Sequence, residues 1–217
     1  MSEPAVALSH MIDCQLRPNE VNDEHIIAAI AAVPRETFVP KAKRSVAYVD
    51  EDISVGHNRF LMEPRVFARL LSAANVKKSD IVLDIGCATG YSSAVIAGLA
   101  DAVVAVEEQE ELAALAEKKL AALDVMNVAV VTCALCDGVA KQGPFDVIFI
   151  EGAVEEIPDA LVKQLKLGGR LVCIKLERGV GRAHMMTNTA DGLERKNLFD
   201  ADVAALPGFT KTQTFVF

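Results

Sequence analysis

Short apolar runs alternate with longer segments of helical apolar spacing between about residues 80 and 175. Such alternation predicts parallel βαβ units, with helices on both faces of one sheet. We therefore expect an α/β fold whose sheet is mostly parallel. Strands are predicted at Ile81–Ile85, Ala102–Val106, Val128–Thr132, Phe145–Ile150 and Arg170–Lys175, and helices at Tyr91–Leu99, Glu110–Leu123 and Ile157–Leu165.

The first 75 residues precede these units and follow a different pattern. Apolar residues recur at helical spacing between Asp23, which can cap a helix, and Pro34, which ends it. A second helix is predicted to begin at Pro64, because proline is favoured in the first helical turn. We expect residues 1–75 to form a helical and irregular N-terminal extension and residues 76–217 the main domain, within one compact unit.

The C-terminal region changes to an alternation of polar and apolar residues. This alternation over His184–Thr189 and Lys211–Phe217 predicts half-buried strands. Asp191 and Gly192 form a hairpin signal between Thr189 and Leu193. We therefore expect the sheet to end in antiparallel strands.

Composition narrows the class of protein. A chain of 217 residues with 52% hydrophobic residues can bury a full core. The net charge of −8, without a long basic run, disfavours nucleic acid as a partner. No apolar stretch approaches the roughly 20 residues that cross a bilayer, so no membrane partner is expected. The N-terminus lacks a secretory pattern and the five cysteines form no disulfide framework, which favours a cytoplasmic location.

No metal site is expected. The four histidines are dispersed along the chain, and the Cys133–Cys136 pair lacks the second Cys or His pair that a metal site needs.

A glycine-containing turn follows the first predicted strand. The residues from Asp84 to Gly90 read D-x-G-x-x-x-G, which is neither the dinucleotide-binding fingerprint nor a phosphate-binding loop with Lys and Ser or Thr. Glycines let a backbone approach a ligand, and a helix N-terminus offers free N–H groups. The turn alone leaves two readings nearly even: a nucleotide-type loop or an ordinary turn of an α/β protein.

Acidic residues at the ends of neighbouring strands favour the first reading. Glu107 closes the second strand, where an acid can accept both hydroxyls of an adenosine ribose, although it could also be an acid at a helix N-terminus. Asp137 follows the third strand and could accept from an adenine amino group or simply form a turn. Since the carboxyl ends of parallel strands meet at one edge, these positions predict a nucleoside site.

Several motifs together resemble the protein-L-isoaspartate O-methyltransferase family over nearly the whole chain. The most discriminating is the Val33–Pro40 run, V-P-R-E-T-F-V-P, because other methyltransferases dependent on S-adenosyl-L-methionine (SAM) lack it. The other motifs are Gln15–Arg17, Ala47-Tyr48, Val82–Gly86, Asp137-Gly138, Pro144–Ile148, Ile157-Pro158 and Gln164–Val172.

The resemblance implies a class I methyltransferase with a Rossmann-like sheet, SAM as methyl donor and S-adenosyl-L-homocysteine as product. It also implies esterification of a carboxylate at damaged aspartyl residues, so the expected partner is a peptide or protein containing isoaspartyl residues. The predicted cofactor-binding residues are Asp84, Ile85, Gly86, Cys87, Gly90, Tyr91, Glu107, Glu108, Asp137 and Gly138.

The acceptor side departs from the family pattern. Where the family carries a threonine and a serine, this chain has Phe60 and Met62, and Glu151 stands where the family usually has a threonine. An ionised Glu151 would repel a carboxylate acceptor unless a cation such as Arg59 compensates it. Arg59, Phe60, Met62 and Glu151 are therefore the acceptor-site candidates. Two alternatives stay open: a methyltransferase with another acceptor, or a SAM-binding module without activity.

Overall fold

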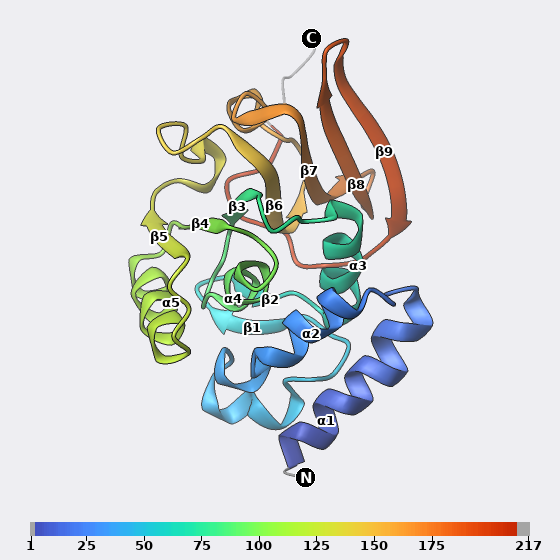
Figure 1. Ribbon diagram of the computed structural model, residues 1–217, viewed down its shortest axis with the longest axis vertical. Helices are drawn as coiled ribbons and strands as arrows, with labels where there is room; N and C mark the ends of the chain where they lie inside the picture. The colour runs from blue at the N-terminus through green and yellow to red at the C-terminus, as the bar shows by residue number, and fades with distance from the viewer. Residues whose placement is uncertain (1–2, 212–217) are drawn as a thin grey trace.

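One seven-stranded sheet organises the protein (Figure 1). The computed structural model describes residues 3–211, so the predicted strand over Lys211–Phe217 lies almost entirely outside the described residues. The strand order is β5-β4-β3-β6-β7-β8-β9. The strands are β3 (Ile81–Ile85), β4 (Ala102–Glu107), β5 (Val128–Thr132), β6 (Phe145–Val154), β7 (Leu165–Glu177), β8 (Val180–Thr189) and β9 (Gly192–Asp200).

The direction of the strands confirms the predicted fold class. The strands from β5 to β7 pair in parallel, whereas β8 and β9 pair antiparallel to their neighbours. The chain turns from β8 into β9 at Ala190 and Asp191, close to the predicted hairpin signal. On the side away from β7, β8 pairs with β9. The alternation pattern did not predict β9, because the central residues of β9 are polar and exposed.

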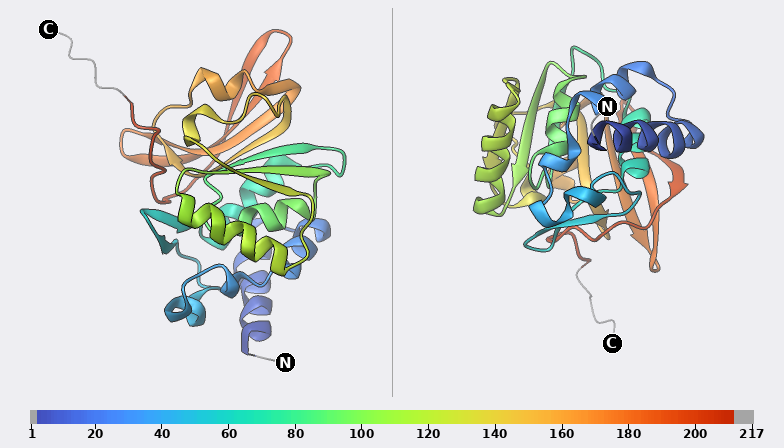
Figure 2. Two further views of the ribbon diagram at one scale, coloured as in Figure 1. Left: turned by 90° about the vertical axis from the view of Figure 1, so that its left-hand side faces the viewer. Right: turned by 90° about the horizontal axis from the view of Figure 1, so that it is seen from below.

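Each face of the sheet has its own covering layer. Residues such as Val82 and Phe149 face the helices α2 (Glu24–Ala32), α3 (Pro64–Ala74) and α4 (Tyr91–Ala97). Residues such as Leu83 and Ile148 face the short helix α6 (Asp159–Val162) and the C-terminal segment around Leu206. Figure 2 shows the N-terminal helices, α4 and α5 (Glu110–Ala122) together on one side of the sheet.

The N-terminal region is more helical than predicted. Helix α1 (Glu3–Met11) continues into a π-helical turn, Ile12–Leu16, and a 3₁₀ turn, Arg17–Asn19. Further 3₁₀ turns cover Arg35–Thr37 and Lys41–Val46. A small antiparallel hairpin then joins β1 (Ile53–Gly56) to β2 (Arg59–Leu61) before α3. The domain boundary at residue 75 stays a prediction.

The predicted helix over Ile157–Leu165 was wrong in length, because only Asp159–Val162 is α-helical. Leu165 already pairs with Phe145 in the sheet, so β7 begins where the helix was expected to end. The side chain of Gln164 bonds the carbonyls of Asp137 and Ala160 and the N–H of Val139, which fixes the turn between them. In residues 3–211 no helix is long and apolar enough to cross a membrane.

An aromatic cluster joins the N-terminal extension to the sheet. The ring of Phe67 lies 5.7 Å from the Tyr91 ring and 5.6 Å from the Phe149 ring, centroid to centroid. Phe38 lies 5.6 Å from Tyr91 on the side of the extension. Phe67 is 2% exposed and therefore connects α3, α4 and β6 through one side chain.

We expect Phe67→Ala to lower the free energy of unfolding by about 3–5 kcal/mol, because the side chain is buried and leaves a cavity. Urea denaturation followed by circular dichroism measures this change. Leu167→Ala is the matched control, since Leu167 is 73% exposed and should shift stability by less than about 0.5 kcal/mol. Equal effects of the two substitutions would contradict the role of the cluster.

Candidate functional site

The predicted cofactor residues gather at the carboxyl edge of the parallel strands. Gly86 follows β3, Glu107 ends β4, and a 3₁₀ turn containing Asp137 (Leu135–Asp137) follows β5. Glu151 lies in β6, on the other side of β3. The chain leads from β3 outward in both directions, so the strand order reverses between β3 and β6. Open α/β sheets bind their ligands at such a reversal.

The turn after β3 has the backbone that a ligand-binding loop needs. The N–H groups of Gly86 and Cys87 both donate to the carbonyl of Val106, at 2.8 and 3.1 Å. Gly86 and Gly90 have φ values of +82° and +90°, which side chains with a Cβ rarely adopt. Gly90 immediately precedes α4, so the loop leads into a helix N-terminus as predicted.

Asp84 is fully buried beneath this loop. One carboxylate oxygen, Oδ2, accepts hydrogen bonds from the hydroxyls of Ser92 and Ser93 at 2.7 and 2.5 Å. The other oxygen, Oδ1, is buried without a hydrogen-bond partner in the structure. Burial raises the pKa of Asp84 to about 6, and the two hydroxyls oppose this shift. Neither serine was among the predicted site residues, although both lie just after the glycine turn.

Glu107 forms a buried ion pair with Arg59. The guanidinium Nε and Nη2 of Arg59 lie 3.1 and 3.0 Å from Glu107 Oε1, and the two side chains are 1% and 0% exposed. The Glu107 carboxylate also accepts from the N–H groups of Ala88 and Gln109, at 3.0 Å each. The second hairpin strand is thereby tied to the carboxyl end of β4.

The structure shows which acid forms the ion pair with Arg59. Sequence reasoning offered Arg59 as a partner for Glu151, whereas every hydrogen bond of its guanidinium in the structure goes to Glu107. Arg59 Nη1 is buried and has no hydrogen-bond partner. Since Glu107 already accepts from several donors, ribose hydroxyls can bind it only by replacing some of them.

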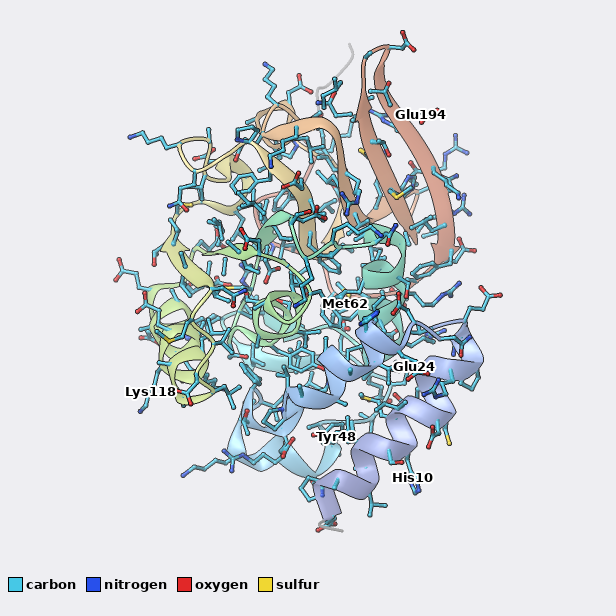
Figure 3. The ribbon with its side chains drawn as sticks, in the orientation of Figure 1. His10, Glu24, Tyr48, Met62, Lys118 and Glu194 are labelled. Carbon is cyan, nitrogen blue, oxygen red and sulfur yellow. The ribbon has the colours of Figure 1, made fainter. Side chains whose placement is uncertain are left out.

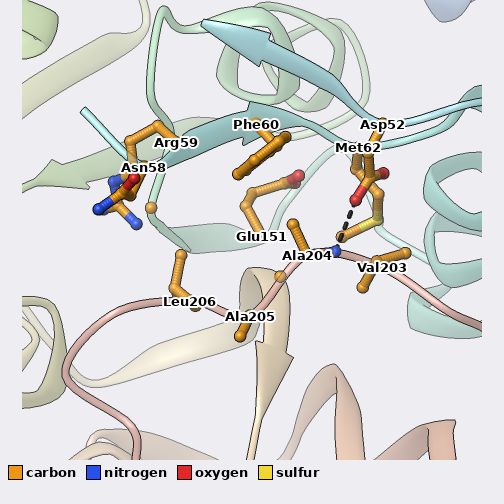
Figure 4. A pocket seen from close by; sticks show the side chains of 12 residues that line it. Asp52, Asn58, Arg59, Phe60, Met62, Glu151, Val203, Ala204, Ala205 and Leu206 are labelled. Carbon is orange, nitrogen blue, oxygen red and sulfur yellow. Dashed lines mark hydrogen bonds between the residues drawn. The ribbon is translucent and has the colours of Figure 1, made fainter. Parts of the chain in front are cut away.

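A small cavity lies beside Gly86, between the hairpin, β6 and the C-terminal segment (Figure 4). Its free volume of about 10 Å³ is close to that of one water molecule. A Cβ on Gly86 would lie 2.9 Å from Leu206 Cδ1 and 3.7 Å from the Glu151 Cβ. The lining residues are Asp52, Asn58, Arg59, Phe60, Met62, Gly86, Glu151, Gly152, Val203, Ala204, Ala205 and Leu206.

The structure therefore brings the four acceptor-site candidates, Arg59, Phe60, Met62 and Glu151, to one cavity. Figure 3 shows Met62 near the middle of the molecule. The C-terminal segment Val203–Leu206 completes the lining, and it was not predicted. Its small and apolar residues carry no chemical signal in the sequence. In the structure its place is fixed by backbone hydrogen bonds of Ala204 and Leu206 with Ala153, and by the bond from the Ala204 N–H to Asp52.

The remaining cofactor candidates differ in exposure. Asp137 is exposed, whereas Gly138 is buried with a φ of +58° and a Cβ there would clash with Gln164. Tyr91 is buried and its ring faces Phe38, Phe67 and the guanidinium of Arg35, 4.9 Å away. Roles for these residues in cofactor binding stay predictions. Over residues 3–211, no group of three or more His, Cys, Asp or Glu side chains could hold a metal ion.

We expect Arg59→Met to lower the free energy of unfolding by about 3–5 kcal/mol, because it leaves the Glu107 carboxylate buried without its cation. The double variant Arg59→Met, Glu107→Gln removes that charge and should recover at least half of the loss. Urea denaturation of the wild type and the three variants, including Glu107→Gln alone, measures the coupling. Additive effects would show that the ion pair does not stabilise the fold.

Comparison with known proteins places this site in a family. The family model "Protein-L-isoaspartate(D-aspartate) O-methyltransferase (PCMT)" matches residues 7–198. A Koribacter versatilis protein-L-isoaspartate O-methyltransferase is 36% identical over 204 residues, covering 94% of this chain and 92% of that protein. The enzyme of that name from Bradyrhizobium sp. is 35% identical over 206 residues, covering 93% of this chain and 94% of the relative.

Solved structures show the same fold. One protein-L-isoaspartate O-methyltransferase superposes with a TM-score of 0.80 at 24% identity, covering 94% of this chain and 66% of that one. A Plasmodium falciparum protein described by the same name, in complex with S-adenosyl-L-homocysteine, superposes with a TM-score of 0.79 at 18% identity, covering 95% and 99%. The chain therefore belongs to the protein-L-isoaspartate(D-aspartate) O-methyltransferase family, a family of SAM-dependent methyltransferases.

Proposed function

We propose that this protein transfers the methyl group of SAM to a carboxylate of L-isoaspartyl residues in damaged proteins. The family match is the observation that carries this proposal, since it extends from the N-terminal extension through both the glycine loop and the acceptor cavity. The product methyl ester would then begin the repair of the damaged residue. The acceptor would be a peptide segment that enters beside Phe60 and Met62.

The residues at the strand ends fit SAM. The buried, unpartnered Oδ1 of Asp84 is an acceptor for a hydrogen-bond donor, and the two glycines at positive φ leave room for a ligand against the backbone. Glu107 would hold the ribose once donors such as Arg59 give way, and Asp137 would lie near the adenine. SAM, when bound, supplies a methyl group on a sulfonium that leaves as the neutral thioether S-adenosyl-L-homocysteine.

The chain's own residues need to supply orientation more than proton transfer. A carboxylate acceptor is already ionised at neutral pH, so no side chain has to remove a proton from it. Methyl transfer then depends mainly on holding the acceptor in line with the methyl group. The cavity is small and lined largely by apolar side chains, which suits exclusion of water from the donor.

A second candidate function is methyl transfer to another acceptor, by an enzyme of the same ancestry. The observation that favours it is the composition of the cavity, where Phe60 and Met62 offer no hydroxyl and Glu151 adds an acid. A third candidate, a SAM-binding module without catalysis, rests on the same departure. The three candidates differ in what happens to a labelled methyl group.

We expect radiolabelled SAM to yield a base-labile methyl ester on an isoaspartyl peptide and none on the matched aspartyl peptide. SAM binding without transfer to the isoaspartyl peptide would overturn the proposed acceptor. Asp84→Ala should weaken SAM binding at least 10-fold, which is about 1.4 kcal/mol, as measured by calorimetric titration. Asp101→Ala, which changes an exposed acid at the opposite end of the sheet, is the control. Unchanged SAM affinity in Asp84→Ala would show that the cofactor lies elsewhere.

We expect Met62→Ser to leave SAM affinity unchanged and to raise the rate of isoaspartyl methylation, because a hydroxyl can donate to the acceptor carboxylate. The increase should be about 3–10-fold in kcat/KM, the range for a modest hydrogen bond. Met62→Ala makes the same cavity without a hydroxyl and is the matched control. An equal gain in both variants would mean that space, and not hydrogen bonding, limits the reaction.

A further inference from the structure

Glu151 carries an unused hydrogen-bonding atom in the acceptor cavity. Its Oε1 is shielded from solvent and has no hydrogen-bond partner in the structure. The side chain extends from β6 into the cavity, between Phe60 and the C-terminal segment at Ala204 (Figure 4). A buried polar atom without a partner costs free energy, so a ligand that supplies the partner is favoured at this place.

The groups that surround Glu151 make its charged form unfavourable. Asp84 approaches from β3 and Asp52 from the segment before β1, and both acids act against ionisation of Glu151. Arg35, from a 3₁₀ turn, acts in the opposite direction, as does the Ser92 hydroxyl of α4. Cys87 and Tyr91 also face the group; their own pKa values are raised, first by burial.

Burial outweighs the single nearby cation. It raises the pKa of Glu151 well above its usual value, and Asp84 adds to the increase. Arg35 opposes this increase, and the Nε and Nη2 of its guanidinium donate to the carbonyls of Ala47 and Met62 at 2.7 and 2.6 Å. Burial and the neighbouring acids therefore favour the neutral carboxylic acid form of Glu151, which has one O–H donor.

We propose that Glu151 selects the methyl acceptor by donating a hydrogen bond from its carboxyl group to the acceptor carboxylate. This inference rests on the proposed function, since it takes the acceptor to be an isoaspartyl carboxylate. The repulsion that the sequence implied is absent when the side chain is neutral, and an attraction replaces it. One carboxylate oxygen of the acceptor is bound by Glu151, and the other is free to receive the methyl group.

No other side chain near Glu151 serves as well. Phe60, Met62 and Val203 have no donor, and the Asp52 oxygens accept from the N–H groups of Glu63 and Ala204. Arg59 Nη1 is the other unpartnered donor in the lining. Its guanidinium is held by Glu107 and lies apart from the Glu151 carboxyl, across the cavity in Figure 4. Arg35 is a further donor beside Met62, since its Nη2 donates to the Met62 carbonyl at 2.6 Å, but Arg35 does not line the cavity.

The opposite role would be that of a proton acceptor. An ionised Glu151 could remove a proton from a neutral acceptor such as an amine or a hydroxyl, which is the chemistry of the second candidate function. The two roles make opposite demands on the side chain: the first needs a donor, which an amide can replace, and the second needs a base, which an amide cannot replace.

The test compares Glu151→Gln with Glu151→Ala on the isoaspartyl peptide between pH 6 and pH 9. We expect Glu151→Ala to lower kcat/KM about 10–100-fold, as for loss of a hydrogen bond to a charged group. In Glu151→Gln, kcat/KM should recover most of the activity that Glu151→Ala loses. The wild-type rate should fall as pH rises through the pKa of Glu151, and this fall should disappear in Glu151→Gln because the amide does not ionise.

Two measurements separate this role from a purely structural one. SAM affinity, measured by calorimetric titration, should change less than about 3-fold in both variants. Glu156→Gln, which alters an exposed acid a few residues further along the chain, should keep the wild-type pH profile.

The outcomes distinguish this inference from the function on which it rests. A wild-type enzyme without isoaspartyl activity overturns both. An active wild type with a Glu151→Gln variant as impaired as Glu151→Ala overturns the donor role, because the amide keeps a donor at this place. An active wild type that Glu151→Ala does not impair shows that Glu151 makes no contact with the acceptor. Each of the last two results leaves the proposed function standing.

Discussion

The ion pair between Arg59 and Glu107 is the constraint on which the site depends. It joins the β1–β2 hairpin, which contributes Asn58, Arg59 and Phe60 to the lining of the small cavity, to the strand end where a ribose is expected. Both charges are fully buried, so neither is stable in its place without the other. The hairpin is therefore positioned by the same carboxylate that is expected to hold the cofactor.

Three acids, one fully buried and two partly buried, form a second polar group of the site. Asp84, Glu151 and Asp52 all have raised pKa values, in each case chiefly because of burial. Asp52 and Glu151 face the cation of Arg35, which belongs to the most discriminating motif of the N-terminal extension. The extension thus does more than cover the sheet. It also places the guanidinium of Arg35 near Asp52 and Glu151, where the positive charge opposes the increase in their pKa values.

The parallel part of the sheet could be predicted from sequence because its strands contain apolar runs that are separated by clear turns. The glycine turn, Glu107 and Asp137 were predicted at one edge because parallel topology leaves little choice. The pairing of Arg59 was not predictable, since it joins residues 48 positions apart and nothing in the sequence favours Glu107 over Glu151. The place of Leu206 and the direction in which the pKa of Glu151 is shifted depend on packing, which residue types alone do not encode.

The last strand of the sheet has a consequence for assembly between molecules. β9 is an edge strand, and a free edge can pair with the edge of another copy. Its central residues Glu194, Arg195 and Lys196 are exposed and charged, so a second strand laid alongside would have to accommodate them. Near its end, the Phe199 ring is covered by Arg69, 3.8 Å above it. The exposed charges of this strand therefore oppose its pairing with a strand of another molecule.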